Sequence, residues 1–341
     1  MLGTLLDDIV PRVKDTLIRV GARVALAEPL IRLLARGRPA GLDPQIAGML
    51  RLYRLLKFPA IDSMSVTHAR RFSEGDLSPL ELAPAQMAEV TDTTVAGVPA
   101  RIYEPRGASG NWIVFFHGGG GAIGSIRGAD STTRYLAAQT HCTVASIDYR
   151  LGPEHKHPAA ITDACASFAA IADRAQRAHA KAKLAVAGDS FGGYLAAQVE
   201  HDARKRNVRR PDVQVLIYPI VDMTLTSPSI DRLAEGFVLT RSLMQWFRGN
   251  YMRDTDDFRA ASPFYWTDLA GASPAIVSTA GFDPLVDEGC AWADRLRSAN
   301  VVVRHRHEPG LIHGFLNVAG GIRAARAATD LLCADILDLL K

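Results

Sequence analysis

Short β-rich runs alternate with helical stretches from about residue 88 to the end of this chain. Two of these runs, 112–116 and 213–218, are apolar enough to be strands buried on both faces. Strands separated by helices form a mostly parallel sheet covered on both faces, so the alternation predicts the α/β class. We expect strands over 89–95, 99–104, 111–116, 142–148, 183–188, 213–218, 275–280 and 301–307. The first two are expected to form a hairpin, and helices are expected over 129–139, 159–174, 192–206, 287–299 and 321–340.

Two segments depart from this alternation, and we expect both to contribute to a helical cap. The first 85 residues show helical periodicity and no strand signal. Their apolar positions are Leu6, Ile9, Val13, Leu17 and Val20 in one helix and Leu50, Tyr53, Leu56 and Phe58 in another. Such a face can pack onto the main domain, lie on a membrane surface or line a substrate entrance, and we favour packing. The predicted organisation is a cap segment over 1–85, α/β core over 86–221, a cap insertion over 222–264 and core over 265–341.

Charge and hydropathy argue against nucleic-acid and membrane partners. The formal net charge is only +3, and the small basic run at 204–210 lies where a helix should end, a place that favours cations. No stretch reaches the roughly 18 apolar residues that a membrane span needs. Asp7 and Asp8 come too early for a signal peptide. We therefore expect no nucleic-acid partner and no stable membrane insertion.

The cysteines and histidines give no sign of a disulfide framework, a metal or a cofactor. Cys142, Cys165, Cys290 and Cys333 lack Cys-x-x-Cys spacing and lie in apolar contexts. We expect free thiols, which are typical of a reducing cytoplasm. Two histidine pairs occur, at 155 and 157 and at 305 and 307, but no carboxylate or thiol stands at ligand spacing.

The hexapeptide Gly188-Asp189-Ser190-Phe191-Gly192-Gly193 fits the pattern Gly-x-Ser-x-Gly. A strand-like run precedes it and a helix-like run follows, which is the setting of a serine nucleophile elbow. The turn would lift the Ser190 hydroxyl to a helix N-terminus, where partial positive charge favours a developing anion. By itself the pattern is weak, because an N-cap serine in an ordinary strand–helix turn has the same sequence.

A second glycine-rich stretch, His117-Gly118-Gly119-Gly120-Gly121, follows the predicted strand that ends at 116. Glycine lets the backbone approach a ligand closely and adopt positive φ. We predict that backbone N–H groups of Gly118, Gly119 and Gly120, together with that of Phe191, form an oxyanion hole. A phosphate-binding loop is the alternative, but the lysine and the spacing of the known phosphate motifs are missing.

An acid and a base follow later strands in the order that an α/β-hydrolase requires. Asp283 comes directly after the predicted strand 275–280, and His313 follows the strand 301–307. Function in α/β sheets concentrates at these carboxyl ends of strands. His313 is predicted to take the proton of Ser190, and Asp283 to orient the imidazole. Asp287 is a rival acid, but its position is typical of the first turn of the next helix.

These motifs together resemble the hormone-sensitive lipase family of carboxylesterases, over about residues 88–341. The matching pieces are His117-Gly118-Gly119-Gly120, Asp148-Tyr149-Arg150-Leu151-Gly152-Pro153-Glu154, Gly188-Asp189-Ser190-Phe191-Gly192-Gly193, Asp283-Pro284-Leu285-Val286-Asp287-Glu288 and His313-Gly314-Phe315. The resemblance implies an eight-stranded α/β-hydrolase core with a helical cap. It also implies cleavage of short to medium acyl esters without a cofactor, and family members often pair as dimers.

The chain departs from the family pattern at two positions. The family usually has a small residue after the nucleophile, where this chain has Phe191, and often an aromatic residue after the third glycine, where it has Gly121. We place Gly121 and Asp189 at the substrate pocket, and we expect Asp189 to orient a neighbouring loop. The added aromatic group at 191 and the missing one at 121 are predicted to change which acyl or alcohol groups fit the substrate pocket.

The sequence thus predicts a serine carboxylesterase that acts on small ester substrates through a Ser-His-Asp triad and a covalent acyl-enzyme. A lipase or an amidase on the same fold is an alternative, because nothing in the sequence reveals the leaving group. A non-catalytic receptor for a small ligand is a further alternative, but such a protein would be expected to have lost part of the triad, and all three residues are present.

Overall fold

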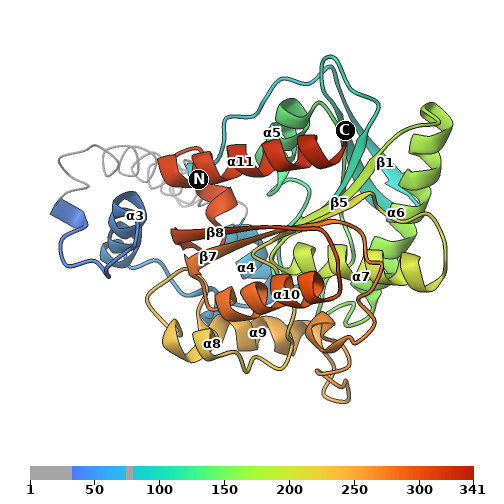
Figure 1. Ribbon diagram of the computed structural model, residues 1–341. Helices are drawn as coiled ribbons and strands as arrows, with labels where there is room; N and C mark the ends of the chain where they lie inside the picture. The colour runs from blue at the N-terminus through green and yellow to red at the C-terminus, as the bar shows by residue number, and fades with distance from the viewer. Residues whose placement is uncertain (1–32, 74–79) are drawn as a thin grey trace, which may run out of the picture.

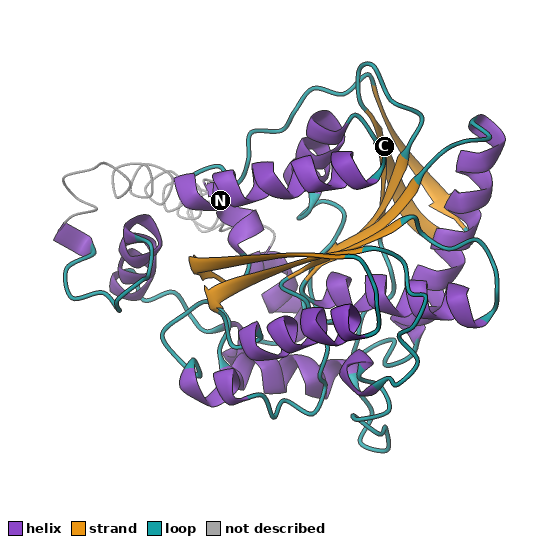
Figure 2. Cartoon of the chain, in the orientation of Figure 1, coloured by secondary structure: helices purple, strands orange, loops and turns teal. Residues whose placement is uncertain are grey.

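The computed structural model describes residues 33–73 and 80–341, so the helix predicted from Leu6 to Val20 lies outside the described residues. The strands form one twisted sheet (Figure 2). There are eight of them, in the order β1-β2-β4-β3-β5-β6-β7-β8. The strands are β1 Glu89–Val95, β2 Val98–Glu104, β3 Trp112–Phe116, β4 Thr143–Ile147, β5 Leu184–Asp189, β6 Val213–Ile217, β7 Ala275–Phe282 and β8 Val303–Ile312. The first two pairings, β1 with β2 and β2 with β4, are antiparallel, and the remaining pairings are parallel.

Helices cover both faces of the sheet (Figure 1). On one side lie α5 (Asp130–Thr140) and α11 (Arg323–Leu339), and on the other lie α6 (Ala159–Ala178), α7 (Phe191–Lys205) and α10 (Val286–Ser298). This two-sided cover confirms the predicted fold class. It also explains why strands such as β3 are apolar throughout, since each of their faces meets a helix layer.

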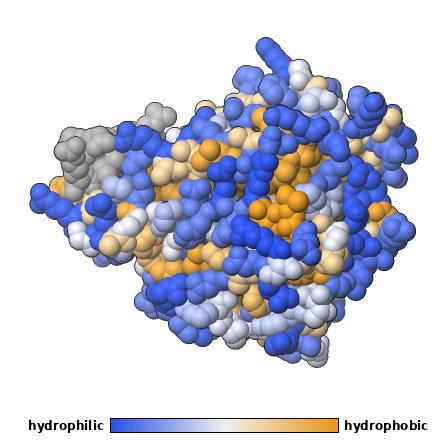
Figure 3. Space-filling model, viewed as in Figure 1, coloured by the Kyte–Doolittle hydropathy of each residue, from blue (hydrophilic) through white to orange (hydrophobic). Residues whose placement is uncertain are grey.

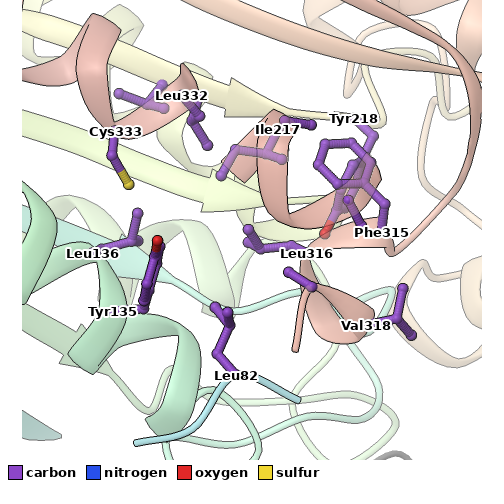
Figure 4. Close-up of a cluster of buried hydrophobic side chains, with 14 of the residues drawn as sticks. Leu82, Tyr135, Leu136, Ile217, Tyr218, Phe315, Leu316, Val318, Leu332 and Cys333 are labelled. Carbon is purple, nitrogen blue, oxygen red and sulfur yellow. The ribbon is translucent and has the colours of Figure 1, made fainter. Parts of the chain in front are cut away.

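Alternate residues of each central strand enter two separate cores. In β3, Ile113 and Phe115 belong to the core beneath α5 and α11, whereas Val114 and Phe116 belong to the opposite core. Figure 4 shows part of the first core, where Tyr135 and Leu136 of α5 and Leu332 and Cys333 of α11 gather over Ile217, Tyr218 and Phe315. All of these side chains are nearly inaccessible to water.

The eight predicted strands and the hairpin between the first two are confirmed, and the differences lie at strand ends. β8 continues to Ile312, past the predicted end at residue 307, and includes Pro309 and Gly310. A proline is tolerated here because β8 is the edge strand of the sheet, where one side of the backbone needs no partner strand. The longer strand carries the chain directly to His313.

The second predicted N-terminal helix is confirmed as α3 (Pro44–Leu55), but the face predicted to pack is partly wrong. Ile46, Ala47 and Leu50 are buried in the first core, whereas Tyr53 and Leu56 are exposed to 37% and 49%. Leu56 lies beyond the last helical residue, so helical periodicity no longer governs where its side chain points. Further along lie η1 (Ile61–Ser63) and α4 (Val66–Ser73).

The segment 222–264 contains the short helix α8 (Pro228–Arg232) and the amphipathic helix α9 (Arg241–Tyr251), followed by η3 (Pro263–Tyr265). Both helices lie on the side of the sheet that carries α10 (Figure 1). The boundaries proposed for cap and core remain a prediction. Residues from both proposed cap segments nevertheless line the same cavity, as described below.

Several smaller expectations have structural outcomes. α7 ends at Lys205, so the basic run does lie at a helix end, where Lys205 pairs with Asp268 and Arg206 with Asp202. The four cysteines are free thiols, two of them buried and two half-buried. Within the described residues, no helix combines the length and apolarity needed to cross a bilayer. The visible surface is largely hydrophilic, with scattered hydrophobic patches (Figure 3).

Candidate active site

Ser190 occupies a sharp turn between β5 and α7. Its backbone has φ 55° and ψ −115°, a strained combination for a residue with a side chain. The turn leaves no room at the flanking glycines, since a Cβ on Gly192 would lie 1.9 Å from the carbonyl oxygen of Phe116. Although Ser190 stands at the N-cap of α7, its hydroxyl makes no capping bond within the described residues. The ordinary N-cap interpretation is therefore wrong, and the hydroxyl is directed elsewhere.

Three side chains from three strand ends form a hydrogen-bonded series. The Nε2 atom of His313 lies 2.9 Å from the Oγ of Ser190, and its Nδ1 atom lies 2.8 Å from the Oδ2 of Asp283. Asp283 is 1% exposed and His313 is 9% exposed, whereas Ser190, at the end of the series, is only partly buried. The structure therefore brings together the three residues that the sequence singled out.

A backbone hydrogen bond orients Asp283, whereas the rival acid Asp287 forms an ion pair away from His313. The backbone N–H of Leu285 donates to the Oδ1 of Asp283 at 2.9 Å, which leaves Oδ2 to face His313. Asp287 lies in the first turn of α10, as expected, and pairs with Arg232. The ring of Tyr218 packs against the other side of His313, with centroids 4.8 Å apart.

The glycine turn after β3 presents free N–H groups beside Ser190, but not all those predicted. Gly119 and Gly120 have φ values of 114° and 60°, and within the described residues neither N–H has a protein acceptor. Phe191 is the first residue of α7, where a backbone N–H lacks an intrahelical partner. The N–H of Gly118, in contrast, donates to the Oδ1 of Asp189 at 2.8 Å. Gly118 is therefore unavailable as an oxyanion donor, which corrects the prediction.

Asp189 holds the glycine turn in place, as the sequence predicted for a neighbouring loop. Its carboxylate is 7% exposed and accepts the Gly118 N–H. Burial raises the pKa of Asp189 to about 6, against the lowering effect of the hydrogen bond from Gly118 and of the nearby His313. Asp189 therefore lies between the glycine turn and the imidazole, in electrostatic contact with both.

Two cavities meet at Ser190. The larger has a volume of about 190 Å³ and extends past the glycine turn toward α5, and the smaller measures about 30 Å³ and lies toward Phe191 and Tyr251. Ser190, Gly120, Leu239 and Phe247 line both. Asp189 lines the larger cavity, as expected, whereas Gly121 lines neither.

The larger cavity is lined in part by residues of both proposed cap segments. Ile61, Ser73 and Glu81 come from the N-terminal segment, and Val238, Leu239, Leu243 and Phe247 come from the insertion. The ring of Phe247 lies directly over the glycine turn, since a Cβ on Gly120 would be 2.2 Å from its Cγ atom. Phe247 is therefore one of the four residues that form the wall shared by the two cavities.

Sequence reasoning assigned no role to several residues that shape this site. Phe247 belongs to the amphipathic helix α9, and helical periodicity does not reveal that its ring lies over Gly120. Tyr149 occurs in a quoted motif, yet its hydroxyl donates to the carbonyl oxygen of His117 at 2.7 Å, which anchors the start of the glycine turn. Glu288 also lies in a quoted motif, and its buried Oε1 accepts the N–H groups of Val221 and Asp222. Their place in family motifs marks Tyr149 and Glu288 as candidates, but it does not reveal which backbone groups their side chains bind.

The described residues contain no group of three or more His, Cys, Asp or Glu side chains placed to hold a metal ion. The paired histidines 305 and 307 instead share a hydroxyl, since the Oγ1 of Thr279 lies 2.9 Å from the Nε2 of His305 and 3.0 Å from the Nδ1 of His307.

Comparisons with known proteins agree with this geometry. Residues 113–317 match the family Abhydrolase_3, described as an alpha/beta hydrolase fold. Carboxylic ester hydrolase LipN of Mycobacterium tuberculosis is 36% identical over 340 residues, which cover 92% of this chain and 90% of that protein. Carboxylesterase NlhH of the same species is 33% identical over 301 residues, covering 84% of this chain and 93% of that protein.

Among solved structures, an alpha/beta hydrolase enzyme from the metagenome of Lake Arreo, Spain, matches with a TM-score of 0.83 and 36% identity, covering 88% of this chain and 99% of its own. The likeness covers most of each chain, and the family match over residues 113–317 spans β5, β7 and β8, whose ends carry Ser190, Asp283 and His313. The chain belongs to the hormone-sensitive-lipase-like family of carboxylesterases, which are serine ester hydrolases of the α/β-hydrolase fold.

Proposed function

We propose that this protein hydrolyses short- to medium-chain acyl esters of small molecules, with Ser190 as nucleophile, His313 as general base and acid, and Asp283 as the residue that orients His313. The observation that carries the proposal is the hydrogen-bonded series from Ser190 through His313 to Asp283, which ends at a cavity. A serine hydroxyl is a weak nucleophile unless a base takes its proton, and this arrangement supplies that base.

In the first half of the reaction, the Ser190 Oγ forms a bond to the ester carbonyl carbon while its proton moves to the Nε2 of His313. Asp283 holds the Nδ1–H tautomer of the ring and stabilises the imidazolium that results. When the tetrahedral intermediate collapses, the bond to the alkoxy oxygen breaks. His313 returns its proton to that oxygen, so a neutral alcohol leaves and an acyl-enzyme remains.

In the second half, a water molecule attacks the acyl carbon and gives a proton to His313. The bond to Ser190 Oγ then breaks, His313 returns the proton to Oγ, and the carboxylic acid departs. Both tetrahedral intermediates carry a negative oxygen. We assign its stabilisation to the N–H groups of Gly119, Gly120 and Phe191, each worth about 3–4 kcal/mol of transition-state stabilisation by analogy with other oxyanion holes.

The cavities support a preference for small substrates. Sites for drug-sized ligands measure roughly 300–1,000 Å³, whereas the two cavities here measure about 190 and about 30 Å³. We further propose that the segments 1–85 and 222–264 act as a cap, because residues from both line the larger cavity. A cytoplasmic location is part of the proposal, supported by four free cysteines, and homodimer formation remains a prediction.

Hydrolysis of p-nitrophenyl esters from acetate to palmitate, by wild type and by Ser190→Ala, tests the proposal. We expect turnover to be greatest on the shorter esters and to vanish in Ser190→Ala, while the exposed serine variant Ser242→Ala behaves as wild type. Intact-mass measurement after treatment with a fluorophosphonate should find one adduct in the wild type and none in Ser190→Ala.

Turnover that survives in Ser190→Ala would exclude Ser190 as the nucleophile. A maximum at palmitate would indicate a lipase, and faster cleavage of anilides than of esters would indicate an amidase. A folded wild type without turnover or adduct would contradict the proposal and favour a receptor.

A further inference from the structure

One arginine of the N-terminal segment reaches across to the glycine turn. Arg70 lies on α4, and its Nε donates to the carbonyl oxygen of Ala122 at 2.9 Å. Its Nη2 donates to the carbonyl oxygen of Gly152, also at 2.9 Å. The guanidinium forms a two-pronged ion pair with Glu154, with N–O distances of 3.0 and 2.7 Å. A single side chain thus joins α4 to two separate loops of the core.

Both of these carbonyl groups belong to residues that are themselves bonded to the glycine turn. The N–H of Ala122 donates to the carbonyl oxygen of Gly119 at 3.0 Å, and the N–H of Gly152 donates to that of Gly121 at 2.7 Å. Arg70 therefore fixes the two neighbours that fix the turn. Arg70 is thus linked to the turn that carries the N–H donors of Gly119 and Gly120 through one further hydrogen bond at each of the two neighbours.

A small hydrophobic cluster gathers at the same place. Ala69, the residue before Arg70, is buried together with Ala122 and Ile123. Partly buried side chains pack around these three, namely Ile61, Met64, Trp246 and Phe247. The cluster therefore brings the N-terminal segment and the insertion together on the glycine turn, and Arg70 supplies its polar anchor.

The glycine turn needs such outside support. Three consecutive residues, Gly119, Gly120 and Gly121, have positive φ and no side chain through which packing could hold them. An oxyanion hole works only if its donors are already aimed at the place where charge develops. An arginine suits this task better than a lysine, since its planar fork donates in several fixed directions at once.

We propose that Arg70 is a positioning residue for the oxyanion hole: docking of α4 through its guanidinium holds the glycine turn in the conformation that stabilises the transition state. This inference rests on the proposed function and adds that the N-terminal segment supports the chemistry itself as well as covering the substrate. Loss of Arg70 should then lower kcat, because the turn contacts the developing oxyanion, and should leave KM nearly unchanged.

The test compares Arg70→Met and Arg70→Lys with Arg71→Met, which removes an exposed arginine from the next position of the same helix. A misplacement of about 1 Å at a reacting centre can cost about 100-fold in rate. We accordingly expect kcat to fall about 10- to 100-fold in Arg70→Met, with KM within about threefold of wild type. Arg70→Lys should recover only part of the loss, and Arg71→Met should match wild type.

A second measurement separates a displaced oxyanion hole from a loosened fold. A trifluoromethyl ketone forms an oxyanion-bearing adduct with the active serine, so its affinity should fall by about the same factor as kcat/KM in Arg70→Met. All variants are assayed well below their own Tm, with circular dichroism as the check on folding.

Arg70→Met with wild-type kcat, a rise in KM alone, or unchanged inhibitor affinity despite a lower kcat would each overturn the inference. These outcomes differ from failure of the proposed function, in which the wild type itself has no turnover that depends on Ser190. In that case the inference falls with the function on which it rests.

Discussion

The ring of Phe191 fills the space in which a side chain at position 121 would lie. An ideal Cβ on Gly121 would be 2.8 Å from the Cζ of Phe191 and 2.8 Å from the Cδ2 of Tyr251. Phe191 is 1% exposed and packs edge-on against Tyr251, with ring centroids 4.6 Å apart. The two departures from the family pattern are therefore linked in space. The aromatic ring that the family often carries at position 121, on the glycine turn, is replaced here by the ring of Phe191, which reaches the same place from the turn at Ser190. We call this replacement the aromatic exchange.

This relationship predicts that substitutions at the two positions are not additive. Gly121→Ala should destabilise the wild type strongly, through both the clash with Phe191 and the positive φ of 72°. In a Phe191→Ala background only the contact with Tyr251 and the backbone strain remain, so the cost should be smaller. We expect an interaction free energy of about 1–3 kcal/mol from a double-mutant cycle in chemical denaturation. If the losses of unfolding free energy in the two single variants sum to that of the double variant within about 0.5 kcal/mol, the aromatic exchange is contradicted.

Phe191→Ala should also change the substrate profile. Phe191 lines the smaller cavity, so truncation enlarges the space next to Ser190 and should move the preferred p-nitrophenyl ester to a longer or bulkier group. The backbone N–H at 191 survives the change, so kcat on the best substrate should stay within about tenfold of wild type. Gly121→Phe with Phe191→Ala should not reproduce the wild-type profile, because the aromatic group then starts from the other turn. A matching profile would refute a specificity role for the aromatic exchange.

Phe247→Ala should merge the two cavities. The side chain lies over Gly120 in the wall that they share, and its removal should leave one continuous space around Ser190. We expect activity toward bulky acyl esters to rise relative to acetate. Because Phe247 is only half-buried, its loss should destabilise the fold by less than the roughly 3–5 kcal/mol of a core phenylalanine. Leu55→Ala, an exposed change on α3, serves as the control and should leave the profile unchanged. An unaltered profile in Phe247→Ala would exclude it as the divider.

Glu288 should make the protein less stable as pH rises. Burial raises the pKa of this carboxyl to about 8, from an ordinary value of 4.5, and the nearby charges of Asp222 and Asp283 act in the same direction. Between these values the folded state keeps a proton that the unfolded state has released, so stability is lost as pH increases through that window. Glu288→Gln keeps an oxygen for the N–H groups of Val221 and Asp222 but does not titrate. The Tm of Glu288→Gln minus the Tm of wild type should therefore increase as the pH is raised from 5 to 9. A pH-independent difference would show that Glu288 does not titrate in this range.

The sheet and the three side chains of the proposed triad could be predicted because local pattern determines them. Strand periodicity located β1 to β8, and the order of Ser190, Asp283 and His313 along the chain matched the strand ends that meet at one edge of the sheet. Hydrogen-bond partners that lie far apart in the sequence and meet only in the folded chain could not be predicted. Nothing near Gly118 in the sequence indicates that its N–H is taken by Asp189, 71 residues away.

The buried face of α3 was misjudged for a related reason. Periodicity shows that a helix has an apolar side, but the side that meets the core depends on where the helix docks. Ile46 and Leu50 face the core, and Tyr53 lies on the rim. The contact between Phe247 and Gly120 was equally hidden, since it joins helix α9 to the glycine turn, more than 100 residues away in the sequence.

The strained backbone at Ser190 sets stability against activity at a single position. A residue at φ 55° and ψ −115° stores about 1–3 kcal/mol of unfavourable conformational energy, which glycine would largely release. We expect glycine at position 190 to be more stable than serine by the strain released, less the roughly 0.5–1 kcal/mol that glycine loses in backbone freedom. Directed evolution that screens only for heat resistance would therefore reward the loss of the proposed nucleophile. Any such selection on this enzyme must score turnover in every round.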